Sequence, residues 1–401
     1  MSQPVEIRPN IYYVGVDDST IDLFEGLWSV SKEGISYNSY LIKDEKTALI
    51  DLTSEIMAEP YIDQLNTLVD ISRINYLVIN HVEPDHASAV ARIRSLAPNA
   101  TILCSARARK MLDTFYAIRE GVQVVEDGDV ISLGQHSLRF FSTPYVHWPE
   151  TMMTYEEREQ VLFSCDAFGG YKALGGNIFD DNRPDIDEYI SQALRYYANI
   201  VANHSQSVRK ALVRLANVPV KIVAPAHGLV WRSTPDRILY LYRTWAEFGE
   251  NGGEARIAVI HASMYGNTTR FTEMVVAGIQ SMGVPLTVMD VARTQMSYIL
   301  PEMWRSWGIL VASPTYESVM FPTMTSLLEM AVLKKMFYKR GARVGSIGWA
   351  GGANRTFETL LCDLHWKLAD AYEFVGVPKA HDLEQAVQFG RRFAGLIKSR
   401  C

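Results

Sequence analysis

A short stretch of the chain gathers four side chains that can bind a metal ion. The apolar run Ile74–Ile79 is followed by His-x-Glu-x-Asp-His, which supplies His81, Glu83, Asp85 and His86. Burying such a segment is costly unless its carboxylates and imidazoles have a partner, and a metal ion is the obvious one. A polar loop with a helix-capping residue would explain one of the four and would give His81 and Glu83 no role. The stretch therefore predicts a metal site.

Three more potential ligands stand in loops that directly follow expected strands. These are His147, Asp166 and His227, which come from segments far apart in the sequence. Rigid sheets build sites from loop residues of this kind. With the first stretch they make four imidazoles and three carboxylates, enough for two metal ions, and Asp166 is the expected bridge because it lies alone between the two groups. His86 is the weakest member, because the other residues can fill the coordination shells.

A second candidate site begins after the expected strand Arg256–Ile260. The next loop contains Ser-Met-Tyr-Gly-Asn-Thr and leads into an expected helix. Hydroxyl groups and backbone N–H groups at a helix start form a cradle for an anion such as phosphate. The absence of GxGxxG and GxxxxGK[ST] disfavours a dinucleotide or P-loop site, and plain helix capping is the alternative. The cradle residues are Ser263, Met264, Tyr265, Gly266, Asn267 and Thr268.

Two further loops follow expected strands of the same region and extend this candidate site. In a doubly wound sheet, ligands bind beyond the carboxyl ends of the strands. Glycines let the backbone approach a flat ring, and Tyr316 or Trp349 can stack on it, although either aromatic can also be core filler. The loop residues are Ser313, Pro314, Thr315 and Tyr316 in the first loop, and Gly348, Trp349, Ala350, Gly351 and Gly352 in the second.

The elements that carry these sites fall into two expected domains, residues 1–250 and 251–401, which meet at the Gly-rich and acidic segment 250–254. The first domain reads as short strands with a few helices, and the second as strands that alternate with helices, which predicts a doubly wound parallel sheet. Pro84 is expected to block a helix at its position. The expected helices include Ala87–Leu96, Ala106–Tyr116, Ile186–Ile200, Thr356–Ala369 and Leu383–Ser399.

Composition excludes several classes of protein. The net charge is −6, from 39 basic and 45 acidic residues, which argues against a nucleic-acid partner. The four cysteines are scattered without a CxxC pair, so a zinc ribbon and a rubredoxin-type iron site are excluded by spacing. The N-terminus has no signal-peptide pattern and no apolar run is long enough for a membrane span. We therefore expect a cytoplasmic protein with no membrane partner.

The ligand pattern resembles that of the metallo-β-lactamase fold, whose hydrolases carry His-x-His-x-Asp-His and then a later His, Asp and His. Here Glu83 replaces the second histidine, and its carboxylate suits iron better than zinc. The complete pattern is similar to that of the flavodiiron family, and the Ser-x-Tyr-Gly-Asn-Thr loop is similar to the FMN phosphate loop of flavodoxins. The resemblance implies an α/β chain: an N-terminal αββα metallo-β-lactamase-like sandwich with two non-haem irons, and a C-terminal flavodoxin-like parallel sheet with FMN.

The resemblance also implies an activity and partners. Members of the family reduce O2 to water, NO to N2O, or both, with electrons that enter at FMN and pass to the iron pair. The implied donor is rubredoxin, a reduced deazaflavin or another carrier. A head-to-tail homodimer, or a dimer of dimers, is implied because it places the FMN of one chain beside the irons of the other.

Some residues depart from the family pattern, and other functions stay open. Glu25 stands where several relatives carry a histidine near the iron pocket, and Tyr196 and Tyr197 are pocket candidates whose helical spacing also fits core packing. One alternative is a metal-dependent hydrolase with a regulatory flavodoxin domain, against which Glu83 argues. The other is a non-enzymatic redox or gas sensor.

Overall fold

Short apolar strands of the N-terminal half pair into two sheets that face each other. The structure is a computed structural model that describes residues 3–400. The first sheet has the order β1-β2-β7-β8-β9-β10-β11 and the second the order β12-β13-β14-β15-β16. The strands of the first sheet are β1 Val5–Arg8, β2 Ile11–Tyr13, β7 Tyr40–Ile42, β8 Thr47–Ile50, β9 Ile74–Ile79, β10 Thr101–Cys104 and β11 Val122–Val124. Those of the second are β12 Val130–Ser132, β13 Ser137–Ser142, β14 Met152–Glu156, β15 Val161–Cys165 and β16 Ile222–Pro225.

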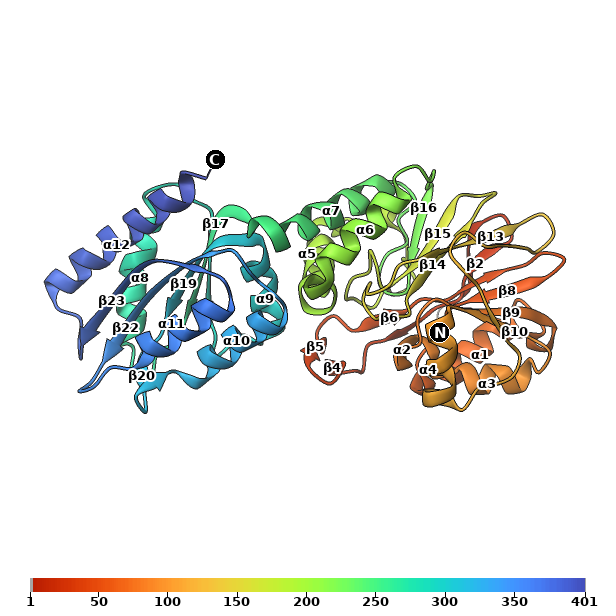
Figure 1. Cartoon of the computed structure of the whole chain (residues 1–401), viewed down its shortest axis with the longest axis horizontal. Coiled ribbons are helices and arrows are strands. Elements are labelled where there is room, and N and C mark those ends of the chain that lie inside the picture. Colours follow the sequence, from red (N-terminus) through yellow and green to blue (C-terminus); the bar gives the residue numbers. More distant parts are fainter. Residues whose placement is uncertain (1–2, 401) are drawn as a thin grey trace. The chain divides into compact units, whose positions relative to one another are not determined.

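Helices cover the outer faces of these two sheets. Figure 1 shows α1, α3 and α4 beside the first sheet and α5 and α6 beside the second, which gives the predicted αββα sandwich. Two small strand pairs, β3 Val16–Asp18 with β6 Ile35–Tyr37 and β4 Leu23–Phe24 with β5 Trp28–Ser29, complete the unit. The helices are α1 Ala58–Asn66, α2 Pro84–Ala87, α3 Val90–Leu96, α4 Ala106–Tyr116, α5 Ile186–Tyr196, α6 Ser205–Leu215 and α7 Pro235–Asn251.

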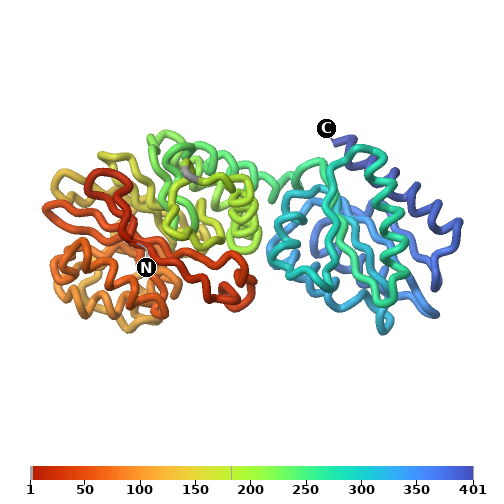
Figure 2. The backbone as a smooth tube through the Cα atoms, turned by 180° about the vertical axis from the view of Figure 1, so that it is seen from behind, coloured from red at the N-terminus to blue at the C-terminus, as the bar shows by residue number. Residues whose placement is uncertain are grey.

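The C-terminal part forms one parallel sheet with helices on both faces. Its strand order, β18-β17-β19-β22-β23, is the 2-1-3-4-5 order of flavodoxin-like folds. Figure 2 shows this sheet from behind, with α12 in blue near the edge of the unit. The strands are β17 Glu254–His261, β18 Leu286–Asp290, β19 Ser306–Ala312, β22 Arg340–Ile347 and β23 Lys367–Val375, with a small pair β20 Thr315–Tyr316 and β21 Val319–Met320. The helices are α8 Asn267–Gln280, α9 Met296–Arg305, α10 Pro322–Leu333, α11 Ala353–Asp363 and α12 Ala380–Lys398.

The two parts form separate compact units, one up to Arg243 and the other from Thr244. Each has its own core; in the second, Val259 of β17 packs with Phe271 of α8 and Phe393 of α12. Helix α7 extends through the start of the Gly-rich segment, and β17 begins directly after Gly253. Within residues 3–400, no helix is long and apolar enough to cross a membrane.

Three of the expected local structures differ from those observed. Pro84 begins helix α2 rather than blocking it, because proline at the first helical position lacks only an N–H that would have no helical partner there. The helix expected over Thr356–Ala369 ends at Asp363, and the chain then enters strand β23. The helix expected over Ile186–Ile200 is regular only to Tyr196, after which the π-helical turn Tyr197–Val201 follows.

Candidate metal centre and anion-binding cavity

The loop after β9 is held in place by buried polar contacts between the two sheets. The carboxylate of Asp51 accepts hydrogen bonds from the backbone N–H and the side-chain amide of Asn80, both at 2.8 Å. The hydroxyl of Thr154, on the second sheet, donates to the Asn80 side-chain oxygen at 2.7 Å. All three residues are buried. His81 therefore leaves the strand from a fixed position, because the residue before it is tied to both sheets.

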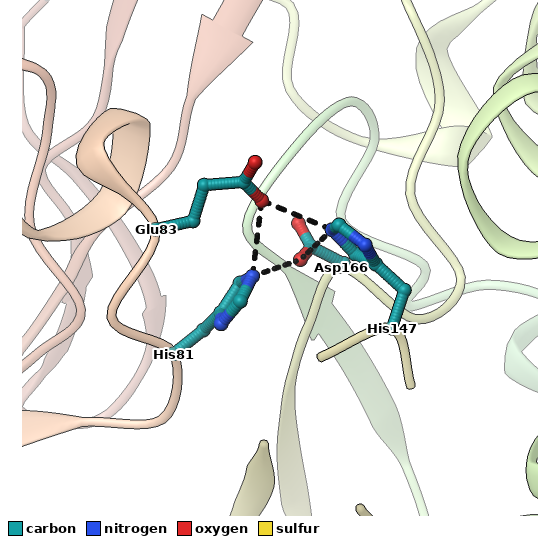
Figure 3. A group of neighbouring side chains, drawn as sticks. All are labelled: His81, Glu83, His147 and Asp166. Carbon is teal, nitrogen blue, oxygen red and sulfur yellow. Dashed lines mark hydrogen bonds and ion pairs between the residues drawn. The ribbon is translucent and has the colours of Figure 1, made fainter. Parts of the chain in front are cut away.

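Four of the predicted ligands form one group at the ends of β9, β13 and β15 (Figure 3). Nε2 of His81 and Nε2 of His147 each lie 3.0 Å from Oε2 of Glu83. The same two nitrogens each lie 3.3 Å from Oδ2 of Asp166. Figure 3 shows the four side chains pointing toward a common centre from three separate segments. Two imidazoles and two carboxylate oxygens thus converge on one point.

The remaining ligands form a second group around the other oxygen of Asp166. Oδ1 of Asp166 lies 2.9 Å from Nε2 of His86 and 3.5 Å from Nε2 of His227. Asp85 completes the group, with its Oδ2 3.3 Å from His86 Nε2 and 3.1 Å from His227 Nε2. The structure therefore brings His86, the weakest of the predicted ligands, as close to Asp166 as any other histidine.

Several polar atoms in these groups are buried without a hydrogen-bond partner among the described residues. They include both side-chain oxygens of Asp85, Oδ2 of Asp166 and Nε2 of His227. Their N···O distances are short, but the geometry is not that of hydrogen bonds. Buried polar atoms that face one another without bonding are the arrangement expected around a cation. The donor set therefore fits metal ions.

The electrostatics of the metal-free groups agree with this interpretation. Burial lowers the pKa of His81, but hydrogen bonds with Glu150 and Glu83 outweigh it and raise the pKa to about 10. Burial raises the pKa of the Glu83 carboxyl, but contact with His147 and His81 holds it well below its usual range. Protonated imidazoles thus supply the positive charge that the buried carboxylates require. A bound metal would supply that charge instead and displace the protons.

A surrounding set of side chains orients the candidate ligands. Oε1 of buried Glu150 lies 2.6 Å from Nδ1 of His81 and also accepts from the N–H of Val82. The Nδ1 atom of His227 lies 2.7 Å from the carbonyl oxygen of Ser36. Sequence reasoning missed Glu150, although an acidic residue so close after His147 was a usable signal. Such partners fix the ring orientation and tautomer of metal-binding histidines.

Aromatic side chains enclose the second group. The hydroxyl of Tyr196 donates to Oδ1 of Asp166 at 3.0 Å, and its ring centroid lies 5.6 Å from that of His227. The ring of buried Phe24, on β4, lies edge-on to His227 at 5.4 Å. Figure 1 shows β4 in the same unit as the strands that carry the ligands. Phe24 was not predicted, because only folding brings this hairpin to the site.

The other two pocket candidates from the sequence, Glu25 and Tyr197, contact different residues. Glu25, in the left-handed region with φ of 51°, accepts a hydrogen bond from the indole N–H of Trp28 at 2.9 Å. The Tyr197 hydroxyl lies 2.8 Å from Oγ of Ser205, and its ring is edge-on to Tyr242. Of the two candidate tyrosines, Tyr196 is the one whose hydroxyl hydrogen-bonds Asp166.

The second candidate site is a cavity of about 510 Å³ at the carboxyl ends of β17, β19 and β22. This volume is in the usual range for small-molecule sites. Of the predicted residues, it is lined by Met264, Tyr265, Asn267, Pro314, Thr315, Tyr316, Gly348, Trp349 and Ala350. Lining residues that the sequence did not single out are Glu317, Ser318, Ser346, Ile347 and Gly376.

The other predicted residues of this site shape its loops. Gly266, with φ of 88°, precedes the first residue of α8, and its N–H donates to the Ser263 hydroxyl at 3.0 Å. The buried Thr268 hydroxyl lies 2.9 Å from that of Ser346. Ser313 is buried at the end of β19. Gly351 and Gly352 precede α11.

Large aromatic side chains stand exposed at the rim of this cavity. Trp349 is 99% exposed and Tyr265 is 90% exposed. Side chains of this size are rarely left in water without a function, and a flat ring between them would cover part of their apolar surface. The N-terminus of α8 supplies backbone N–H groups for a phosphate. The cavity thus fits a phosphate-bearing molecule with a flat aromatic ring.

Comparisons with known proteins identify relatives over nearly the whole chain. Residues 35–228 match the model of the ODP family beta lactamase. The chain is 34% identical over 402 residues to a nitric oxide reductase of Moorella thermoacetica, covering 99% of this chain and 100% of that protein. It is also 34% identical to an anaerobic nitric oxide reductase flavorubredoxin of Pectobacterium atrosepticum, covering 97% of this chain and 77% of the relative.

Solved structures with the same fold extend over the whole chain. The rubredoxin oxygen:oxidoreductase of Desulfovibrio gigas superposes with a TM-score of 0.94 at 26% identity, covering 99% of both chains. A flavodiiron protein of Giardia intestinalis superposes with a TM-score of 0.93 at 27% identity, covering 100% of this chain and 98% of the other.

Proposed function

Because the chain belongs to the flavodiiron protein family, we propose that it is an oxidoreductase that reduces O2 to water, NO to N2O, or both. The centre of reaction is a pair of non-haem irons, and FMN supplies the electrons. The names of the relatives support this activity: the Moorella protein is a nitric oxide reductase and the Desulfovibrio protein a rubredoxin oxygen:oxidoreductase.

The observation that carries this proposal is the position of Asp166 between two ligand groups. Its Oδ2 faces His81 and His147, and its Oδ1 faces His86 and His227. One carboxylate that reaches both groups suits a bridge between two metal ions. Glu83 completes the first group and Asp85 the second. All seven predicted residues are thus assigned as iron ligands.

Iron is favoured over zinc by the composition of the first group. Its second position is Glu83, which adds a hard oxygen donor and a negative charge, both suited to iron that cycles between two oxidation states. When bound, the irons supply the redox chemistry and FMN the electrons. The polypeptide positions these centres and controls their surroundings.

The enclosing side chains explain how the chain contributes to the reaction. Phe24 and Trp148 place apolar ring edges against His227 and His81, which keeps bulk water from the ligands. The Tyr196 hydroxyl donates to Asp166 and so holds the bridging carboxylate in one orientation. O2 and NO are small and uncharged, so an apolar wall admits them while it excludes ions.

The cavity of the C-terminal unit is assigned to FMN. The loop 263–268 and the first turn of α8 would hold the phosphate, and the loops 313–316 and 348–352 would hold the flavin ring. The exposed rings of Trp349 and Tyr265 would supply apolar surface to cover the flavin ring. The two compact units divide between Arg243 and Thr244, a few residues before the predicted boundary at 250/251, which stays a prediction.

The partners of the reaction are proposed by analogy with the family. A rubredoxin-type protein is the proposed electron donor, which the name of the Desulfovibrio relative supports. A reduced deazaflavin is the alternative donor. We also propose a cytoplasmic location and a homodimer, in which the FMN of one chain serves the irons of the other; a mass about twice the 45.2 kDa of the chain in light scattering tests the dimer.

The function is tested by counting cofactors and then following gas consumption. Iron and FMN are measured in the purified protein, which is reduced without oxygen and then exposed to O2 or to NO. The proposal requires bound iron and FMN and rapid consumption of at least one gas. Zinc in the site, or a colourless protein that does not take up FMN, contradicts it and favours the hydrolase alternative.

A further inference from the structure

We propose that Arg343 and Glu373 form a positioning pair for FMN, which fixes the two loops that hold the flavin ring. The proposal rests on the proposed FMN site. Neither residue lines the cavity, so the pair acts through the loops and not by direct contact.

Arg343 is a fully buried charge with two separate partners. It lies in β22 with a side-chain exposure of 0%. Its Nη1 lies 2.8 Å from Oε1 of Glu373, on β23, and its Nη2 donates to the carbonyl oxygen of Ser313 at 3.2 Å. A buried guanidinium is costly unless several acceptors satisfy it, and its planar fork can serve two acceptors at once. Arg343 therefore connects the end of β19 with β23.

The first of these contacts fixes the loop after β19. Ser313 is the first residue of the loop 313–316, whose next three residues line the cavity. A Cβ atom at Gly345 would lie 2.0 Å from the Ser313 carbonyl oxygen and 3.0 Å from Nη2 of Arg343. Only glycine at position 345 therefore lets this carbonyl reach the guanidinium. The close approach sets where the loop begins.

The second partner of Arg343, Glu373, lies near the loop after β22. Glu373 pairs in register with Gly345 in the parallel ladder of β22 and β23. A Cβ atom at Gly351 would lie 3.7 Å from Oε2 of Glu373, so this carboxylate oxygen stands directly beside the loop 348–352. Gly348, Trp349 and Ala350 of that loop line the cavity. The ion pair thus holds the first of the loops assigned to the flavin ring through a hydrogen bond, and its Glu373 carboxylate lies next to the second.

A second ion pair in the same unit serves as a control that distinguishes a purely structural role from the positioning of FMN. Arg256 and Glu302 also form a partly buried ion pair, with Nη2 3.0 Å from Oε2. Arg256 lies near the start of β17, at the end of the sheet opposite the cavity. Loss of either pair costs stability, but only loss of the Glu373 contact should change FMN binding.

The test compares E373Q with E302Q in the full-length protein. FMN is removed, the apoprotein is titrated with FMN by flavin fluorescence, and the thermal midpoint of each apoprotein is recorded. We expect E373Q to weaken FMN binding by about tenfold, because a charge-assisted contact is lost, and E302Q to leave it within about twofold. At saturating FMN, E373Q should also alter the visible circular dichroism of the bound flavin.

Three results overturn the proposal. E373Q binds FMN as tightly as the wild type, or E302Q weakens binding as much as E373Q, or the wild-type apoprotein binds no FMN. A protein that binds FMN as expected but consumes neither O2 nor NO contradicts the proposed function alone. Because Glu373 is 27% exposed at its side chain, E373Q is expected to fold.

Discussion

Oε1 of Glu150 lies 2.6 Å from Nδ1 of His81, while Nε2 of the same ring lies 3.0 Å from the Glu83 carboxylate. Glu150 contacts the ring nitrogen that points away from the ligand group, and so it orients the imidazole without being a ligand itself. The other nitrogen, Nε2, faces the candidate iron position. A carboxylate behind a metal-binding histidine raises its basicity and fixes its orientation.

Replacing Glu150 should loosen metal binding without removing a ligand. We expect E150Q to weaken iron binding by about 10- to 100-fold, because the amide cannot provide the same charge behind His81. Competition with a chelator and metal analysis measure the change. The matched control is E156Q, since buried Glu156 holds His136 Nδ1 at 3.0 Å in the same unit but away from the candidate ligands. Equal metal loss in both variants would refute the role of Glu150.

Asp166 and Asp85 should differ in how many metal ions depend on them. Asp166 faces both ligand groups, whereas Asp85 approaches only His86 and His227. We expect D166N to lose both irons and D85N to lose one, while the FMN content stays unchanged in both. Atomic emission spectroscopy measures the number of irons per chain in each variant. A D166N protein that retains both irons would show that this carboxylate is not the bridge.

The candidate ligands were found in the sequence because they follow expected strands, of which β9, β15 and β16 are apolar and β13 is mixed. These strands belong to two sheets, so it is the packing of the two sheets that brings the strand ends together. The three loops of the C-terminal cavity were found in the same way. The contacts that orient these residues were not predictable, because Glu150 and Phe24 reach the site only through the fold.

Two points that the sequence left wrong or open have clear physical causes. The β23 sequence mixes polar and apolar residues, and most of its residues are only partly buried, so it lacks the continuous apolar run of an inner strand. Its strand form is set by pairing with β22, which sequence periodicity does not contain. Tyr196 and Tyr197 are adjacent residues at the point where the α-helix changes into a π-helical turn. Regular helical spacing therefore did not show which hydroxyl faces Asp166.

The metal-free protein should lose stability in alkaline solution. The folded-state pKa of His81 is raised from 6.5 to about 10, because hydrogen bonds with Glu150 and Glu83 outweigh its burial, and that of His86 is raised to about 9, because Asp85 and Asp166 outweigh its burial. A raised histidine pKa gives stability that is fully present below the unfolded value and is lost as the pH rises through the folded value. The window of loss is therefore about pH 6.5 to 10.

This dependence is measured by thermal unfolding at several pH values in that window. The midpoint of the metal-stripped protein should fall as the pH rises, whereas iron binding should strengthen because its ligands must be deprotonated. H147Q should reduce the slope, since the pKa of His147 is also raised to about 10 where its contacts with Asp166 and Glu83 outweigh its burial. A metal-free midpoint that stays constant across the window contradicts the assignment of these pairs.

Glu83 should decide which metal the first group prefers. We expect E83H to retain less iron and more zinc than the wild type, because an imidazole replaces the hard, charged oxygen donor that lies 3.0 Å from both His81 and His147. The gas reductase rate should fall with the iron content, since zinc does not change its oxidation state.

E83D is the control that keeps a carboxylate, and it should keep the preference for iron even if binding weakens. Metal analysis after loading with an equimolar mixture of iron and zinc measures the ratio. Unchanged iron content and reductase rate in E83H would show that the carboxylate at this position does not select the metal, and the preference would then have to come from Asp85 and Asp166.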